Sequence, residues 1–389
     1  MRILLCNKFY YRRGGDCIYT LDLEEMLVSK GHQVAVFAMA CPENIDSPWS
    51  SYFPSMVGLD SKLSFALRSL GDREVRDKFG RILDDFAPDV VHLNNIHSQL
   101  SPVIARIAHS RGIRVVWTLH DLKLLCPRYD CLRGGKESCE LCFKNKFNAQ
   151  RHRCMKNSLA ASCLAFAEAM RWNSAFLEEN TDLFVCPSRF MMKKMERGGF
   201  GKSKLLHLGN AMDVSRCARE DYSERKDYYC YVGRLSHEKG VETLVEAASS
   251  LPYRLLVIGD GPLAGKLPAR GNIEYLGRRD WQYIKTVVGS ARFTVMPSIC
   301  YENNPLAVIE SLCLGTPVLG ADIGGIPELI EERVNGLCFE SGNAESLASG
   351  IREMFGLSFD YTGIAGDSCA RFSRDSYYDT LVKHVYGLK

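Results

Sequence analysis

The chain of 389 residues is 46% hydrophobic and 24% charged, a composition that is typical of globular proteins and excludes disordered and fibrous classes. Its length predicts two or three domains, each large enough to bury its own core. No apolar stretch approaches the roughly 18 residues that a membrane-spanning helix requires. Polar Asn7 and Lys8 also end the first apolar run too early for a signal peptide. We therefore expect a soluble, cytoplasmic protein.

The net charge of +3 is divided unequally, because residues 1–206 carry +8 and residues 207–389 carry −5. A modest basic excess favours an anionic partner such as a nucleotide, a phosphorylated substrate or the inner face of a membrane. The acidic residues among these cations, and the lack of a nucleic-acid-binding motif, argue against DNA or RNA as the partner. We expect peripheral contact with an anionic membrane, through basic helices such as 189–197 and through the basic cysteine-rich segment at 126–154.

Predicted strands and helices alternate along the whole chain. In the first half, short apolar runs predict strands at 2–5, 33–37, 90–93, 114–118 and 183–186, and segments of helical period predict helices at 16–30, 73–86, 100–111, 159–179 and 189–197. Apolar periodicity is lost over 209–227, which indicates a linker. In the second half, strands are predicted at 229–232, 254–258, 293–295 and 317–319, and helices at 241–249, 281–288, 306–314 and 344–355.

Continuous apolar strands that alternate with helices are typical of parallel sheets covered on both faces. The expected fold class is α/β, with two doubly wound, Rossmann-like domains that face each other across a cleft. We place the first domain at 1–208, with a cysteine-rich insertion at 126–154, the second at 209–365, and a C-terminal helix at 366–389 that crosses back to the first domain. Ligands of such sheets bind beyond the carboxyl ends of the strands, so the loops at those ends should carry the chemistry.

Two loops that precede predicted helices suit phosphate groups. Gly14 and Gly15 lie directly before the first long helix, where backbone N–H groups and the helix N-terminus attract anions. Their distance from the first strand and the missing third glycine exclude a dinucleotide-binding fingerprint. In the loop 233–240, a guanidinium and an ammonium group from Arg234 and Lys239 suit a diphosphate. The alternative interpretations are a plain loop in the first case and solvated cations in the second.

Two glutamates, Glu302 and Glu310, are separated by seven residues around the start of a predicted buried helix. A carboxylate inside such a helix is unfavourable unless a hydrogen-bond donor faces it. A ribose diol would serve Glu310, and sugar hydroxyls would serve Glu302. An internal arginine or lysine is the alternative partner for Glu310.

This spacing, followed by Gly-Thr-Pro-Val at 315–318, resembles the signature of retaining GT-B glycosyltransferases, and the chain is most similar to glycosyltransferase family 4. Further motifs match that family in order, namely Gly14-Gly15, Thr118-Leu119-His120-Asp121, Gly233-Arg234-Leu235-Ser236, Ile258-Gly259-Asp260-Gly261-Pro262 and Gly324-Gly325-Ile326-Pro327-Glu328. The resemblance extends over nearly the whole chain. It differs after Glu302, where Asn303-Asn304-Pro305 replaces the family's usual Gly-Phe-Gly beside the donor sugar.

The resemblance implies a hexosyltransferase that acts with retention of configuration. It would move a sugar from a UDP- or GDP-linked donor to a glycan or lipid-linked acceptor in surface polysaccharide biosynthesis. The implied catalytic residues are His120 and Glu302, and the implied donor-binding residues are Gly14, Gly15, Arg234, Lys239, Asn303, Asn304, Leu306 and Glu310. No cofactor or catalytic metal is implied, because two cations and backbone N–H groups neutralise the leaving diphosphate.

Other assignments stay open at this point. His92 and His97, on and after the strand at 90–93, are weaker candidates for the acceptor site. A sugar-nucleotide epimerase, or a non-catalytic protein that binds a nucleotide sugar, is the alternative to a glycosyltransferase. An epimerase would show no transfer that depends on an acceptor.

Five of the sixteen cysteines lie within residues 126–154, and Cys139 and Cys142 have zinc-knuckle spacing. With Cys126, Cys131 and Cys154 they could form a structural zinc site, which would stabilise a segment of little apolar content. Free or redox-active thiols are the alternative. The segment is basic, through Arg128, Arg133, Lys136, Lys144, Lys146, Arg151, Arg153 and Lys156. The other cysteines, such as Cys6 and Cys230, are expected to be small buried hydrophobes.

Overall fold

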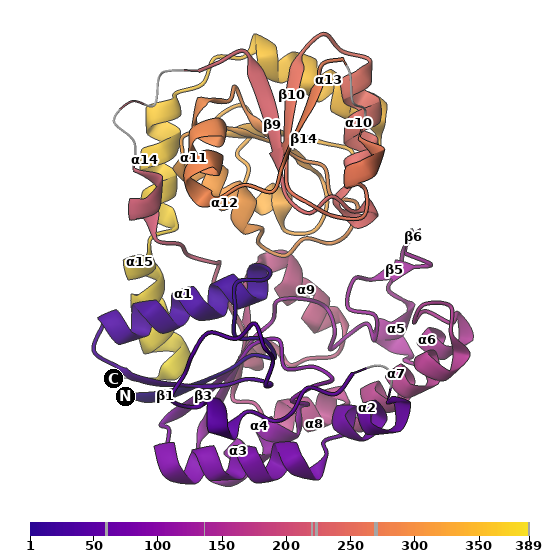
Figure 1. The fold of residues 1–389 in the computed structure, drawn as a ribbon, viewed down its shortest axis with the longest axis vertical. Helices are drawn as coiled ribbons and strands as arrows, with labels where there is room; N and C mark the ends of the chain where they lie inside the picture. The colour runs from indigo at the N-terminus through magenta and orange to yellow at the C-terminus, as the bar shows by residue number, and fades with distance from the viewer. Residues whose placement is uncertain (59–60, 136, 219–220, 222–224, 268–270, 388–389) are drawn as a thin grey trace. The chain divides into compact units, whose positions relative to one another are not determined.

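The computed structural model describes residues 1–58, 61–135, 137–218, 221, 225–267 and 271–387, which form two compact units (Figure 1). Unit 1 comprises Met1–Gly209 together with Tyr378–Lys389, and unit 2 comprises Asn210–Tyr377. Of the predicted linker, residues 219–220 and 222–224 lie outside the described residues, as does Lys136 of the basic cysteine-rich segment.

Unit 1 is built on a six-stranded parallel sheet in the order β2-β1-β3-β4-β7-β8. Its strands are β1 (Arg2–Cys6), β2 (Gln33–Phe37), β3 (Val90–Leu93), β4 (Arg114–Thr118), β7 (Leu183–Cys186) and β8 (Leu205–His207). Its longer helices are α1 (Gly15–Ser29), α2 (Lys62–Ser69), α3 (Arg73–Phe86), α4 (Val103–Ser110), α7 (Leu159–Arg171), α8 (Ser174–Glu179) and α9 (Arg189–Arg197). Helices α3 and α4 pack together on one face of the sheet, and α1 covers the other (Figure 1).

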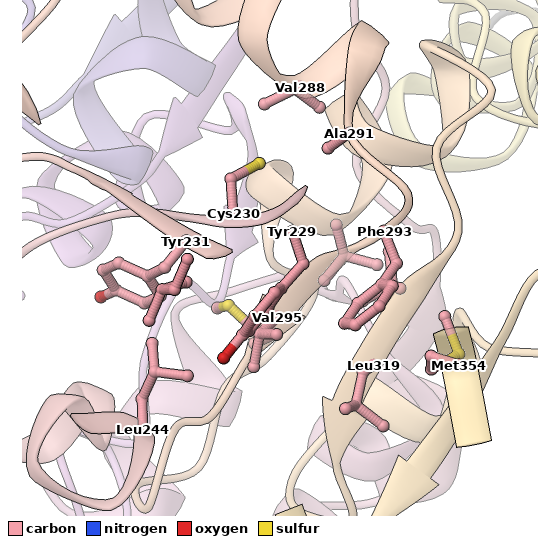
Figure 2. Packing of buried hydrophobic residues seen from close by; sticks show 14 of the residues in the cluster. Tyr229, Cys230, Tyr231, Leu244, Val288, Ala291, Phe293, Val295, Leu319 and Met354 are labelled. Carbon is pink, nitrogen blue, oxygen red and sulfur yellow. The ribbon is translucent and has the colours of Figure 1, made fainter. Parts of the chain in front are cut away.

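Unit 2 repeats this architecture with a parallel sheet in the order β11-β10-β9-β12-β13-β14. Its strands are β9 (Tyr228–Val232), β10 (Arg254–Ile258), β11 (Ile273–Gly277), β12 (Thr294–Met296), β13 (Val318–Ala321) and β14 (Gly336–Phe339). Its helices are α10 (Val241–Ser249), α11 (Trp281–Ser290), α12 (Leu306–Cys313), α13 (Ala344–Gly356) and α14 (Tyr361–Arg371). In the core, Tyr229 of β9 stacks on Phe293, with the ring centroids 5.1 Å apart (Figure 2).

Both sheets reverse their strand order at one point, between β1 and β3 in unit 1 and between β9 and β12 in unit 2. In unit 1, β2 is added beside β1, whereas β4, β7 and β8 are added in the opposite direction beyond β3. In unit 2, β10 and β11 are added beside β9, whereas β13 and β14 are added in the opposite direction beyond β12. Loops at the carboxyl ends of these two strands therefore diverge and leave a crevice, which is where open parallel sheets bind their ligands. The predicted fold class, with two doubly wound sheets, is confirmed.

Several strands and helices differ from the sequence-based expectation. β8, β11 and β14 were not predicted, and all three are edge strands, where only one neighbour pairs and less of the strand is buried. In β11, for example, only Ile273 is fully buried. The predicted helix at 159–179 is divided into α7 and α8, because the Asn173 side chain accepts a hydrogen bond from the backbone N–H of Phe176 and caps a new helix.

The predicted C-terminal helix over 366–389 is also divided. The chain forms α14, then α15 (Arg374–Thr380) and a single π-helical turn at Leu381–Tyr386. The π-turn buries Leu381, Val385 and Tyr386 in unit 1. The Val385 carbonyl accepts a hydrogen bond from Arg114 Nε at 2.8 Å, so the end of the chain is anchored to the start of β4.

Around the cysteine-rich segment, regular structure is sparse. Its elements are β5 (Leu132–Arg133), β6 (Glu137–Ser138), α5 (Leu141–Lys144) and α6 (Asn148–Arg151), and none is longer than four residues. Beyond them, the segment is turn and loop, with left-handed backbone at Tyr129 and Cys131. Backbone hydrogen bonds of turns, such as Cys139 N–H to the Cys131 carbonyl oxygen at 2.7 Å, and side-chain contacts together hold this insertion in place.

Candidate functional site

Three loops at the carboxyl ends of the unit 2 strands meet beside the switch point. The loop after β9 carries Arg234 and Lys239 and ends at Gly240, where φ is +70° and a Cβ would lie 1.8 Å from the carbonyl oxygen of Pro297, in the loop after β12. A Cβ at Gly324, after β13, would lie 2.2 Å from the carbonyl oxygen of Glu302. Only glycine permits these approaches, so the sequence packs the loops backbone against backbone.

Lys239 and Glu302 form an ion pair between two of these loops, with Lys239 Nζ 2.5 Å from Glu302 Oε1. The Ser298 hydroxyl donates a second hydrogen bond to the same oxygen, at 2.7 Å. The Lys239 side chain is 28% exposed and that of Glu302 13% exposed. Burial opposes the charge on Lys239, but the Glu302 carboxylate outweighs it, and the pKa of Lys239 is raised. The Lys239 ammonium group is therefore held charged in the loop after β9.

The other predicted donor residues of unit 2 lie around the same switch point. Arg234 is exposed, and no carboxylate of the described residues lies within ion-pair distance of it. Glu310, on α12, lines a narrow crevice with Trp281 and with Val232 and Met296, the last residues of β9 and β12. The indole N–H of Trp281 is buried and has no hydrogen-bond partner within the described part of the chain.

The segment 303–306 turns into α12 and is partly locked in place. Asn304 is buried, and its side-chain oxygen and carbonyl oxygen accept hydrogen bonds from the backbone and side chain of Asn210, both at 2.8 Å. The side-chain oxygen of Asn304 is thus already engaged in a hydrogen bond within the protein. Asn303 is half-buried, and Leu306 begins α12, where the first backbone N–H groups have no partner inside the helix.

In unit 1, His120 follows β4 and is held by two contacts. Its Nε2 lies 2.9 Å from Asn94 Oδ1, and its ring packs edge-on against Tyr19 of α1, with centroids 4.8 Å apart. Burial lowers the pKa of His120 to about 4, against the opposing charge of Asp16, so the imidazole is neutral at pH 7. Sequence reasoning missed Asn94, although it directly follows β3. Its buried amide nitrogen finds no acceptor among the described residues.

Gly14 caps the N-terminus of α1, and Gly15 is its first residue. Gly14 is extended, with φ −153°, a conformation open to any residue. A Cβ at Gly15 would meet no atom within 4 Å, and one at Gly14 would meet only the Asp16 carboxylate at 3.5 Å. Neither the backbone conformation nor the packing requires glycine here. The absence of side chains therefore leaves open space at the N-terminus of α1, which a bound group could occupy.

His92 was wrong as an acceptor-site candidate, because it is completely buried. Its Nδ1 lies 2.8 Å from the Tyr386 hydroxyl, and its Nε2 lies 2.8 Å from the Thr118 hydroxyl. Thr118 in turn contacts Tyr19, with the two oxygens 3.3 Å apart. His92 therefore joins the C-terminal turn to the residues behind His120, and it has no surface for a substrate.

His97, in contrast, lines a cavity of about 620 Å³ at the switch point of unit 1. Its ring stacks on Trp117, with centroids 5.5 Å apart. Burial lowers its pKa well below the ordinary value, and the nearby Lys123 and Lys8 act in the same direction. The loops after β1, β2, β3 and β4 all contribute to this cavity, as the doubly wound fold predicts.

The five cysteines at 126–154 lie near one another as free thiols. The Cys131 thiol hydrogen-bonds to Cys126 and lowers the pKa of Cys126 to about 7, whereas the same contact and burial raise the pKa of Cys131. Charges on Cys126 and Cys154 influence Cys142. Across the described ranges, no three Cys, His, Asp or Glu side chains are placed to hold one metal ion. The structural zinc site stays a prediction.

Comparison with known proteins identifies this arrangement. The model of "Glycosyltransferase Family 4" matches residues 13–216, and that of "Glycosyl transferases group 1" matches residues 218–360. A 42.6 kDa protein from the cps region of Klebsiella pneumoniae is 24% identical over 351 residues, 85% of this chain and 87% of that protein. A putative teichuronic acid biosynthesis glycosyltransferase, TuaC of Bacillus subtilis, is 35% identical over 123 residues, 31% of each chain.

Two uncharacterized glycosyltransferases of Methanocaldococcus jannaschii match over only 61% and 34% of their lengths. Among solved structures, Anabaena HepE in complex with UDP covers all of both chains with a TM-score of 0.71 at 16% identity, a likeness that shows a shared GT-B fold. No helix in the described part of the chain is both long enough and apolar enough to span a membrane.

Proposed function

Because the chain belongs to glycosyltransferase family 4, we propose that it transfers a hexose from a nucleoside diphosphate sugar, with retention of configuration, to a glycan or lipid-linked acceptor in surface polysaccharide biosynthesis. The observation that carries this proposal is the ion pair of Lys239 with Glu302 at the switch point of unit 2. The names of relatives such as TuaC support the pathway class, and the UDP complex of Anabaena HepE supports the nucleotide-sugar donor.

The donor diphosphate is assigned to Lys239 and Arg234. A diphosphate beside Lys239 competes with Glu302 for the ammonium group and so frees the Glu302 carboxylate for a sugar hydroxyl. Glu310 and the crevice beside Trp281 are assigned to the nucleoside, with the carboxylate on the ribose hydroxyls. The N–H groups of Asn303, Asn304 and Leu306, at the N-terminus of α12, add dipoles that favour negative charge.

In the proposed reaction, the acceptor oxygen attacks the anomeric carbon from the face on which the diphosphate leaves. The bond from that carbon to the diphosphate oxygen breaks, and the departing phosphate oxygen takes the acceptor's proton. His120 is neutral, so it can exchange hydrogen bonds with sugar hydroxyls without adding charge. Gly14 and Gly15 leave space for phosphate oxygens to approach the N–H groups at the start of α1.

The test begins with a panel of UDP-, GDP-, ADP- and dTDP-sugars, screened by thermal stabilisation. A donor at 100 times its dissociation constant should stabilise the protein by roughly 2.7 kcal/mol. Lys239→Ala and Glu310→Ala should each weaken donor binding by about one charge-assisted hydrogen bond, roughly 1.5–3 kcal/mol. Arg254→Gln, which removes an exposed cation at the opposite end of β10, is the matched control and should bind normally.

Transfer to an acceptor extract should continue in EDTA, because the proposal gives charge neutralisation to Arg234, Lys239 and helix N–H groups. Activity that EDTA abolishes and Mg²⁺ restores, with the fold unchanged, would contradict that part. Folded Lys239→Ala and Glu310→Ala variants with wild-type donor affinity would contradict the site. Donor consumption without glycosidic product in any acceptor extract would favour an epimerase.

A further inference from the structure

A series of hydrogen bonds runs through the core of unit 1, from the C-terminal turn to the surroundings of His120. The Tyr386 hydroxyl lies 2.8 Å from His92 Nδ1, and His92 Nε2 lies 2.8 Å from the Thr118 hydroxyl. The Thr118 hydroxyl lies 3.3 Å from that of Tyr19, whose ring packs edge-on against His120. The four linked side chains, which we call the His92 network, are each at most 6% exposed, namely Tyr386, His92, Thr118 and Tyr19.

The strands place this network directly beside the predicted catalytic histidine. Thr118 is the last residue of β4, and His120 lies two positions further on. Both contact Tyr19 of α1, so they face the same side of the sheet, as residues two apart on a strand do. Asn94, just after β3, holds His120 Nε2 at 2.9 Å. The ring of His120 is therefore fixed by Asn94 on one side and by Tyr19, a member of the network, on the other.

Stability alone does not explain why four polar side chains are linked inside this core. Apolar side chains of the same shape often stabilise a core equally well, but only hydrogen bonds impose a direction on the groups that they join. A neutral imidazole donates through one nitrogen and accepts at the other. Burial lowers the pKa of His92 to about 3 and keeps it neutral, so His92 can hold two hydroxyl groups in fixed positions at once.

A second tyrosine of the C-terminal segment makes the same kind of bond away from the site. The Tyr378 hydroxyl lies 2.8 Å from His32 Nε2, and His32 Nδ1 lies 3.3 Å from the N-terminal amino group of Met1. His32 directly precedes β2, whereas His120 follows the carboxyl end of β4. In a parallel sheet these are opposite edges. Tyr378 therefore anchors the segment at the edge opposite the site, and comparison with it separates anchoring from positioning.

We propose that the His92 network positions His120 for the reaction. Its members are buried and touch neither sugar nor nucleotide. Their hydrogen bonds set the orientation of the Tyr19 ring, and that ring sets the orientation of the imidazole that exchanges hydrogen bonds with sugar hydroxyls. The C-terminal turn, through Tyr386, thereby serves the reaction as well as anchoring the chain. The inference rests on the proposed function, because it takes His120 as a group that contacts the reacting sugars.

Donor turnover by the full chain, at saturating donor and a fixed amount of acceptor extract, tests the proposal. Tyr386→Phe removes one hydroxyl and should lower turnover roughly tenfold, because a small misplacement of a catalytic group slows the reaction strongly. Its affinity for the donor nucleotide should equal that of the wild type. Tyr19→Phe, which keeps the ring and breaks the network at its other end, should act in the same direction. Tyr378→Phe is the matched control and should lower thermal stability without changing turnover.

A double-mutant cycle shows whether the effect passes through His120. In a His120→Ala background, Tyr386→Phe should cause no further loss of turnover, since the group that it positions is then absent. Losses that multiply in the double variant would overturn the inference. Wild-type turnover in folded Tyr386→Phe and Tyr19→Phe would also overturn it. An equal loss in Tyr378→Phe would do the same, because anchoring of the C-terminal segment would then be the cause.

Histidine NMR on the full chain gives a readout that needs no substrate. The chain has nine histidines, and the imidazole signal that is missing from His120→Ala identifies His120. This signal should shift in Tyr386→Phe and stay in place in Tyr378→Phe. An unshifted His120 signal in Tyr386→Phe overturns the inference, whatever the activity. If no nucleotide sugar binds or reacts, the proposed function fails, and the NMR comparison alone decides whether the His92 network positions His120.

Discussion

Three histidines, His92, His97 and His120, lie on or after the neighbouring strands β3 and β4, and burial keeps each of them neutral. The pKa is lowered to about 3 for His92 and to about 4 for His120. His97 shifts in the same direction. Each imidazole contacts other side chains. His92 hydrogen-bonds to the hydroxyl groups of Tyr386 and Thr118, His120 hydrogen-bonds to Asn94, and His97 stacks on Trp117. Because the folded protein keeps these imidazoles neutral, its free energy of unfolding should depend on pH.

Acid should therefore destabilise unit 1 below the ordinary histidine pKa of 6.5. Between pH 6.5 and the lowered folded-state values, the unfolded chain binds protons that the folded chain excludes, so stability falls as pH falls. For His92 alone, the loss between pH 7 and pH 5 should be about 2 kcal/mol. Denaturant unfolding at both pH values measures it.

His92→Gln should reduce this pH-dependent loss by about the same 2 kcal/mol, since glutamine does not titrate. His109→Gln, which changes an exposed histidine on α4, is the matched control. An unchanged pH dependence in His92→Gln would show that His92 does not stay neutral in the folded protein.

At the scale of elements, the cysteine-rich segment is held by contacts between side chains and loops. The Lys146 ammonium group donates to the Leu124 and Leu125 carbonyl oxygens, at 3.1 and 2.5 Å. The Arg128 guanidinium donates to the Cys154 carbonyl oxygen at 3.1 Å. The Arg128 bond joins the start of the segment to its end. The Cys126 and Cys131 thiols meet across a local turn, in which the Tyr129 N–H donates to the Cys126 carbonyl oxygen at 2.7 Å.

We expect oxidised dithiothreitol to link Cys126 and Cys131. The Cys126 thiolate attacks the reagent's disulfide, the Cys131 thiol then displaces the reagent as its dithiol, and the protein loses two hydrogen atoms. Peptide mass mapping identifies the linked pair. Cys126→Ser should abolish the product, and Cys163→Ser, which changes a half-buried thiol of α7, should not.

Metal analysis of the same preparation separates the two interpretations of the segment. One zinc ion per chain at purification, released only as the thiols react, would contradict the free-thiol arrangement and favour the predicted structural zinc site.

At the scale of the whole molecule, the structure shows which cations of the basic first half are ion-paired and which are exposed. The basic helix α9 and the basic cysteine-rich segment were both expected to face a membrane, and in α9 Lys194 and Arg197 ion-pair with Glu140. Exposed cations without an ion pair in the described residues lie at Lys193 of α9 and, in greater number, at Lys144, Arg151, Arg153 and Lys156 of the cysteine-rich segment and the residues just after it. Phe147 and Leu159, 47% and 49% exposed, lie on either side of Arg151, Arg153 and Lys156 in the sequence. Basic and apolar groups together are typical of reversible membrane contact.

The protein should therefore sediment with anionic vesicles at low salt and dissociate as the Debye length shortens. Replacement of Arg151, Arg153 and Lys156 by glutamine should weaken binding, since each cation near an anionic surface contributes up to about 1 kcal/mol. Arg197→Gln, which changes an ion-paired cation, is the control. Equal sedimentation with neutral and anionic vesicles, or none with either, would refute the contact.

Patterns that are local in the sequence determined most of the elements and most of the chemistry. Buried strands such as β1 and β9 are short runs of apolar residues, and the glycines that pack the unit 2 loops are part of the motifs that indicated a phosphate site. Cys6 and Cys230 are fully buried, as their apolar surroundings predicted. Periodicity, turn residues and composition act within a few residues, so one sequence suffices to identify their effects.

Tertiary structure alone decided which distant residues meet. His92 contacts Tyr386, 294 residues away, and Lys239 contacts Glu302, 63 residues away. Lys8, Cys41 and His97 line one cavity only because loops after four different strands converge on it. Edge strands such as β11, with one paired neighbour, carry too little apolar signal to stand out. Such features depend on strand order and on what each side chain is buried against, and these are properties of the folded chain rather than of any local segment.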